Sequence, residues 1–210
     1  MLVNRFEDTL RQGGDAALRQ AAGFFMHHDP VHQTLREIAR RLDALGVPYA
    51  VVGGMALVAH GYVRTTEDVD VLVSPDALKR IHQELEGSGY LPVFVGSKNL
   101  RDTQTGVRIE FLVTGGFPGD GKPKPVAFPA PEGASVEIDG IRFANLTTLI
   151  ELKLASGMTN PGRLRDLADV QELLRVLNLP QEYGDRLSPY VREKFAELWN
   201  AIADDDRSAS

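Results

Sequence analysis

Three carboxylate side chains have the sequence environment of β-strands, and their spacing suits metal chemistry. Asp68 and Asp70 alternate with apolar residues in 68–73, and Glu110 lies between apolar neighbours in 107–113. If the two strands are adjacent, the three acids converge on one face, where they repel one another unless a cation lies between them. Such a set is typical of two-metal phosphoryl or nucleotidyl transfer, because hard cations require oxygen ligands. A solvated strand face is the alternative interpretation.

A pair of glycines precedes these acids. The apolar run 49–52 predicts a buried strand that stops at Gly53-Gly54, and 55–60 then favours a short helix, with Gly61 placed to end it. Glycine has no Cβ, so the backbone of Gly53 and Gly54 could approach a phosphate closely. A plain structural turn is the alternative.

The rest of the chain predicts an α/β (α+β) fold, in which a small mixed β-sheet has the carboxylates on one face and helices on the other. We expect an N-terminal helical extension at 1–30, a core at 31–145 and a C-terminal helical region at 146–210. Periodicity and capping residues predict further helices over 31–45, 75–85, 147–157, 163–177 and 189–202. Strands are predicted over 90–95 and 107–113, and a hairpin over 136–143. The remaining segments are a turn at 101–106, a loop at 115–131 and a frayed tail from 204.

Composition narrows the classes of function. The net charge of −6 argues against broad, sequence-blind binding of nucleic acid, although a local basic patch could hold RNA. No cysteine is present, which excludes disulfides and Cys-ligated zinc. We find no membrane-span-length apolar run and no signal-peptide pattern, so the expected location is cytoplasmic. Lys122 and Lys124 are expected to be solvated loop residues, with contact to RNA or a nucleotide as the alternative.

The order of these motifs resembles the nucleotidyltransferase superfamily that includes DNA polymerase β. Gly53-Gly54, then Asp68-Val69-Asp70, then an isolated strand acid form the signature. Within the superfamily, the chain resembles the minimal nucleotidyltransferases and the AbiEii-type toxins of toxin–antitoxin systems, and the segments 64–67, 149–155 and 163–169 fit that group. The similarity covers roughly residues 45–178.

The resemblance implies roles for the acids and the glycines. Gly53 and Gly54 would begin the turn that holds the triphosphate of a nucleoside triphosphate. Asp68, Asp70 and Glu110 would bind two Mg²⁺ ions, and Glu110 would also help to deprotonate the acceptor hydroxyl. The third acid is often Asp in this superfamily, so the longer Glu makes its use as a base less secure.

The resemblance also assigns cations to the phosphates. Arg64 and Lys153 would counter charge in the transition state, although each could be an ordinary surface residue. Asp166 or Asp169 would match a functional aspartate of AbiEii-type proteins, or could pair with arginines of the same helix. Arg108 could pair with the strand carboxylates when metal is absent.

Two functional hypotheses follow. The first is Mg²⁺-dependent transfer of a nucleoside monophosphate from a nucleoside triphosphate to an acceptor hydroxyl, on an RNA end, a protein or a small molecule, within a toxin–antitoxin system. The second is a non-catalytic nucleotide-binding protein, or an antitoxin-type partner of a helical HEPN-like toxin.

Overall fold

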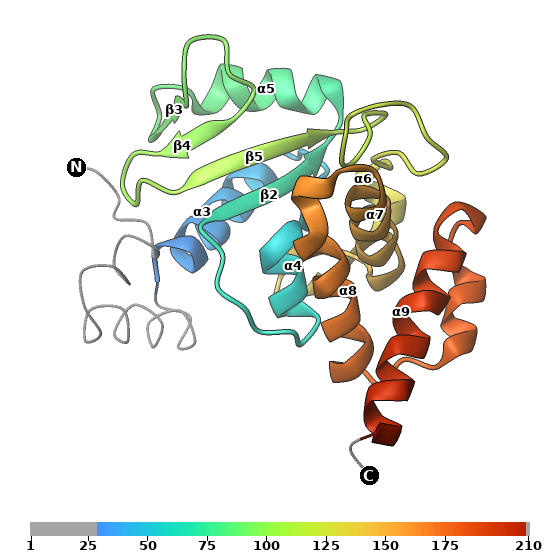
Figure 1. Ribbon diagram of the computed structural model, residues 1–210. Coiled ribbons are helices and arrows are strands. Elements are labelled where there is room, and N and C mark those ends of the chain that lie inside the picture. The colour runs from blue at the N-terminus through green and yellow to red at the C-terminus, as the bar shows by residue number, and fades with distance from the viewer. Residues whose placement is uncertain (1–28, 209–210) are drawn as a thin grey trace.

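A seven-stranded mixed β-sheet forms the centre of the protein, in the strand order β3-β4-β5-β2-β1-β7-β6 (Figure 1). The computed structural model describes residues 29–208, with side chains described as far as residue 204. The extension expected at 1–30 therefore lies outside the described residues, apart from its last two. The mixed α/β fold expected from the sequence is confirmed, whereas the division at residue 145 stays a prediction.

The middle of the sheet is built from the stretch that carries the glycines and the aspartates. β1 (Ala50–Val52) leads directly into α4 (Gly53–Ala59), and the chain returns antiparallel as β2 (Asp68–Val73). Val52 is paired with Asp70. Because Gly53 follows Val52, the antiparallel return brings the glycine backbone beside the second aspartate. The helix starts at Gly53 itself, two residues before the predicted start.

The neighbouring strand β5 (Arg108–Val113) runs parallel to β2, in a register that pairs Asp68 with Arg108 and Asp70 with Glu110. Residues paired in this way share a face of the sheet. The opposite, apolar face contacts α3 (Pro30–Ala44) and α5 (Pro75–Leu85), and the ring of His82 on α5 lies against Phe111. The amphipathic helices thus bury one face of the sheet and leave the carboxylate face to other elements.

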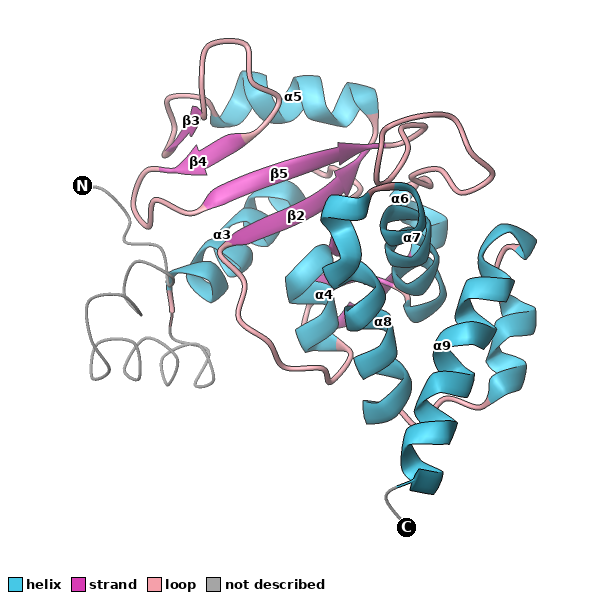
Figure 2. Ribbon diagram, viewed as in Figure 1, coloured by secondary structure: helices cyan, strands magenta, loops and turns pink. Residues whose placement is uncertain are grey.

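Two of the three C-terminal helices line the carboxylate side, and the last one packs against these two (Figure 2). The C-terminal elements are α7 (Leu146–Thr159), the short 3₁₀ turn η1 (Pro161–Arg163), α8 (Leu164–Val176) and α9 (Pro189–Ser208). Asn145 caps α7 by accepting from the backbone N–H of Thr148 at 2.9 Å. α7 is apolar on most sides because it packs against α4, α8 and α9 together. No helix within 29–208 is long and apolar enough to cross a membrane.

Several predicted elements differ at the edge of the sheet and in the loops. β3 spans only Tyr90–Pro92, and β4 (Leu100–Asp102) occupies part of the predicted turn. The strands β6 (Ser135–Ile138) and β7 (Ile141–Ala144) confirm the hairpin, while α6 (Pro131–Ala134) and the 3₁₀ helix η2 (Gln181–Arg186) were not predicted. The helix α9 continues into the segment expected to fray, as far as Ser208.

The prediction of a solvated Lys124 is wrong. Its side chain is 5% exposed, and its ammonium bonds the Pro118 carbonyl, the Asp120 carboxylate and the Thr159 hydroxyl. The lysine ties the Gly/Pro-rich loop to the end of α7, a contact that loop composition does not reveal.

Candidate active site

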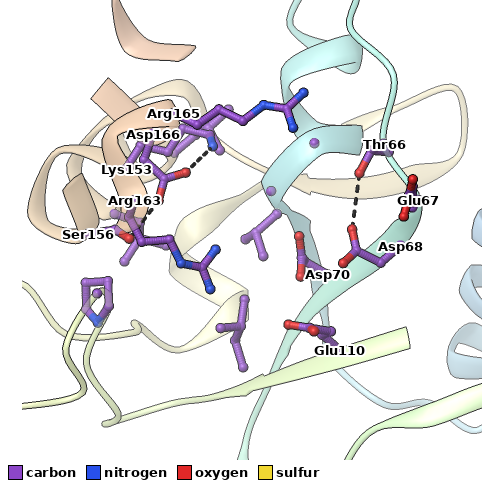
Figure 3. Close-up of a pocket in the computed structure, with 18 of the residues that line it drawn as sticks. Thr66, Glu67, Asp68, Asp70, Glu110, Lys153, Ser156, Arg163, Arg165 and Asp166 are labelled. Atoms are coloured by element: carbon purple, nitrogen blue, oxygen red, sulfur yellow. Dashed lines mark hydrogen bonds and ion pairs between the residues drawn. The ribbon is translucent and has the colours of Figure 1, made fainter. Parts of the chain in front are cut away.

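The three strand carboxylates converge on the floor of a cleft of about 720 Å³. One oxygen from each of Asp68, Asp70 and Glu110 can be chosen so that all lie within 4.8 Å of one another (Figure 3). We call these residues the acidic triad. The parallel register explains the convergence, because it aligns Asp70 with Glu110 on neighbouring strands. Three close carboxylate oxygens form a donor set that fits hard divalent cations such as Mg²⁺.

The electrostatics of the acidic triad favour a cation. Burial, together with the nearby charge of Asp68, raises the pKa of Asp70 to about 7. Arg108 supplies part of the missing positive charge, since its guanidinium contacts Glu110 and lies 3.8 Å from the Asp68 carboxylate. The expected pairing of Arg108 with the strand carboxylates is therefore confirmed. It leaves Asp70 without a direct cationic partner among the described residues.

The glycine turn is shaped by its contact with the triad strand. Gly53 has a φ of +60°, and a Cβ added there would lie 1.8 Å from an Asp70 carboxylate oxygen. A Cβ on Gly54 would lie 2.7 Å from the Thr66 hydroxyl oxygen, which itself donates to Asp68 at 3.1 Å. Both glycines line the cleft. Only a residue without a side chain fits at Gly53, because both the space and the backbone conformation exclude one.

A second charged cluster, which we call the buried network, consists of Arg64, Lys153, Ser156, Asp166 and Asp169. The ammonium of Lys153 lies 2.7 Å from the Asp169 carboxylate and 2.9 Å from the Asp166 carboxylate. Arg64 approaches Asp169 at 3.0 Å, and the Ser156 hydroxyl donates to Asp166 at 2.7 Å. Two cations and two anions thus balance one another between α7, α8 and the segment before β2.

This network changes the view of four residues singled out in the sequence. Arg64 and Lys153 do line the cleft, but both are held in ion pairs, so their contact with phosphate stays a prediction. The alternative that Asp166 and Asp169 pair with arginines of their own helix is wrong. Their partners come from other elements, because α8 turns this face toward α7.

Comparison with known proteins assigns this chain to a family. Residues 15–198 match the sequence pattern of a family described as uncharacterised nucleotidyltransferases. The chain belongs to this family. The nucleotidyltransferase class expected from the sequence is thereby confirmed, while the AbiEii-type subfamily stays a prediction. No curated protein gives a significant match.

Solved structures bear on the fold of this nucleotidyltransferase. The structure of ANT(2")-Ia in complex with adenylyl-2"-tobramycin is similar with a TM-score of 0.50 and 14% identity, over 82% of this chain and 97% of that one. An antigenic nucleotidyltransferase-like protein from Paracoccidioides brasiliensis aligns with a TM-score of 0.44 and 17% identity, over 68% of this chain and 74% of its own. At its identity, the first likeness supports the shared fold alone.

Sequence reasoning missed two residues of the nucleotidyltransferase cleft. Arg163 ends η1 and Arg165 lies in the first turn of α8, and both line the cleft opposite the acidic triad. In Figure 3 the Arg163 side chain points toward the space beside the triad, whereas the Arg165 side chain extends toward the helix that begins at the glycine turn. The sequence analysis considered these arginines only as possible ion-pair partners of Asp166 and Asp169. A signal was present in the sequence, since neither arginine lies on the apolar stripe of this helix.

Proposed function

We propose that this nucleotidyltransferase transfers a nucleoside monophosphate from a nucleoside triphosphate to an acceptor hydroxyl in a Mg²⁺-dependent reaction. The observation that carries the proposal is the register of β2 and β5, which aligns Asp70 with Glu110 beside Asp68 at the floor of a cleft. Three acids in this arrangement cost free energy unless cations bind, and the protein keeps them together.

Asp68, Asp70 and Glu110 would hold two Mg²⁺ ions through their carboxylate oxygens. When bound, the ions supply positive charge that stabilises the attacking and leaving oxygens of an in-line displacement. The fit rests on the oxygen-only donor set and on the raised pKa of Asp70, both of which favour a bound cation.

The chain's own groups would orient the reactants. The backbone of Gly53 and Gly54 lines the cleft without a side chain of its own, so a triphosphate can lie against it. An acceptor hydroxyl oxygen forms a bond to the α-phosphorus, the bond from that phosphorus to the bridging oxygen breaks, and pyrophosphate leaves. Glu110 receives the acceptor proton on a carboxylate oxygen, a role that requires the Arg108 contact to loosen.

Labelled nucleotides test the proposal. Each of the four α-³²P nucleoside triphosphates is incubated with the protein, Mg²⁺ and cell lysate, and transfer of label to RNA, protein or small molecules is followed. We expect transfer by the wild type and a loss of at least about a thousandfold in Asp70→Asn, since one ligand of the metals is lost. Equal transfer by both proteins, with matching circular dichroism spectra, would contradict the proposal.

The same experiment addresses the acceptor. Label in RNA, in a protein or in a small molecule identifies the acceptor class directly. The role in a toxin–antitoxin system, the helical HEPN-like partner and the cytoplasmic location stay predictions from the sequence. Label that enters a small helical protein copurifying with the chain would support the first two.

A further inference from the structure

The cationic residues that line the cleft fall into two groups. Arg64, Lys153 and Arg108 are each held by carboxylates of this chain. Arg163 and Arg165 are exposed, and neither side chain makes an ion pair or hydrogen bond with any residue in the described part of the chain. The positive charge available to a ligand is therefore concentrated on these two arginines.

Both arginines line the same cleft as the acidic triad. In Figure 3 the Arg163 guanidinium points toward Asp70 and Glu110, and the Arg165 side chain extends toward the helix that begins at the glycine turn. Anything that lies between the triad and the start of α8 contacts metal ligands on one side and free guanidinium groups on the other.

The buried network holds the start of α8 in place. Asp166 is fixed by Lys153 at 2.9 Å and by the Ser156 hydroxyl at 2.7 Å. The Asn160 side chain accepts from the backbone N–H of Gly162 at 2.9 Å, which orders the turn just before Arg163. The two arginines thus extend from a rigid base, an arrangement that limits the entropy lost when they bind a ligand.

Free guanidinium groups opposite a divalent-metal site suit phosphate. Arginine binds phosphate oxygens through two parallel N–H groups, and these charge-assisted hydrogen bonds are strong. Metals on the triad can contact only part of a triphosphate, so the remaining negative charge requires cations from another wall of the cleft. Arg64 and Lys153 are already neutralised by aspartates.

We infer that Arg163 and Arg165 bind the β- and γ-phosphates of the nucleoside triphosphate, while Arg64 and Lys153 serve chiefly to hold the start of α8. The inference rests on the proposed function and names the residues that select a triphosphate over a monophosphate. It predicts that the energy of phosphate recognition comes from the two arginines that have no partner in the described structure.

Binding measurements without turnover test this assignment. Isothermal calorimetry with Mg²⁺ uses the α,β-methylene analogues of ATP, GTP, CTP and UTP, and the matching monophosphates. For the analogue that binds the wild type best, we expect Arg163→Gln and Arg165→Gln each to weaken binding about tenfold, because each loses a charged hydrogen-bonded pair. Binding of the monophosphate is expected to stay unchanged. Arg175→Gln, on the same helix but outside the cleft, serves as the matched control.

The outcomes separate this inference from the proposed function. Suppose that the wild type binds an analogue and transfers label. If the double variant with both Arg163→Gln and Arg165→Gln then binds the analogue within about twofold of the wild-type affinity, the inference is overturned and the proposed function stands. If the arginine variants weaken monophosphate and analogue equally, the assignment to the β- and γ-phosphates is wrong. If the wild type binds no analogue and transfers no label, both fail.

Discussion

The cleft contains two charged clusters that differ in how their charges are balanced. The buried network matches two cations with two aspartates, and its central carboxylate, Asp169, is 2% exposed. The acidic triad gathers three carboxylates, and its one arginine, Arg108, lies beside Asp68 and Glu110 with a side chain that is 44% exposed. Burial and the neighbouring charge raise the pKa of Asp70 to about 7.

This difference separates framework from binding surface. In a balanced buried cluster the charges are paired with one another and bind no ion from solution. The main effect of such a cluster is therefore to fix the helices and loops that carry it. An unbalanced cluster stores electrostatic free energy that a ligand of opposite charge releases. The same argument applies with opposite sign to Arg163 and Arg165, which are unbalanced cations. The comparison predicts that substitutions in the network mainly change stability, and substitutions in the triad mainly change binding.

The largest effect on stability is expected from Asp169→Ala. The change leaves Arg64 without its carboxylate partner and Lys153 with Asp166 alone, and an uncompensated buried charge costs about 3–5 kcal/mol. Urea unfolding followed by circular dichroism measures the loss. Glu172→Ala is the control, because Glu172 lies on the same helix and pairs only at the surface with Arg175. A loss below about 1 kcal/mol would contradict the framework role of the network.

Unlike Asp169→Ala, the variant Asp70→Asn is expected to raise the free energy of unfolding of the metal-free protein. Burial raises the pKa of Asp70 from 3.8 to about 7, so the folded state binds a proton more tightly than the unfolded state. The wild type therefore loses stability as pH rises through about 4 to 7, and the amide variant does not. At pH 8 with EDTA we expect the variant to be more stable by on the order of 1–3 kcal/mol.

Two further results complete this test. The advantage of Asp70→Asn should shrink toward zero as pH falls below 3.8, since the carboxyl then becomes protonated in the unfolded state as well as in the folded one. Saturating Mg²⁺ should reverse it, because the ion stabilises only the wild type. An amide variant that is less stable at every pH would show that Asp70 is a structural residue, as those of the buried network are.

Sequence patterns were sufficient for the triad because the relevant signals are local. The alternation around Asp68 and Asp70 and the isolated acid at Glu110 define a strand face whatever surrounds it. The pairing of β2 with β5 was a hypothesis, and the observed register confirms that the acids meet. Their roles in catalysis stay predictions.

The buried network was beyond such reasoning. Lys153 and Asp166 are 13 residues apart, and Arg64 and Asp169 are 105 apart. Which charges meet depends on how α8 packs against α7, and helical periodicity fixes only the apolar stripe of each helix. Local spacing therefore favoured pairs within one helix. The short edge strands were missed for a similar reason, since three-residue strands leave little pattern to detect.

A smaller effect in the triad is expected from Arg108→Met. The guanidinium contacts Glu110 and lies near Asp68, so it occupies space and charge that a metal would use. Its removal should tighten Mg²⁺ binding without nucleotide by about tenfold, as expected for one charge about 4 Å away in a partly solvated site. Calorimetry with Mg²⁺ alone measures this change. Arg101→Met is the control, because Arg101 on β4 lies opposite Arg108 in the sheet but outside the cleft. This variant should leave the Mg²⁺ affinity unchanged.

The smallest effect is expected from Ser156→Ala, which removes one hydrogen bond from the buried network. Asp166 loses the hydroxyl at 2.7 Å but keeps Lys153, so the free energy of unfolding should fall by only about 1 kcal/mol. Ser88→Ala, in an exposed turn, controls for the loss of a hydroxyl. Asp166 also orients the start of α8. The affinity of the Ser156→Ala variant for the triphosphate analogue therefore shows whether the serine hydrogen bond also positions the two arginines. Unchanged affinity means that Lys153 alone holds the arginines in place, whereas a severalfold loss means that the serine bond sets their position.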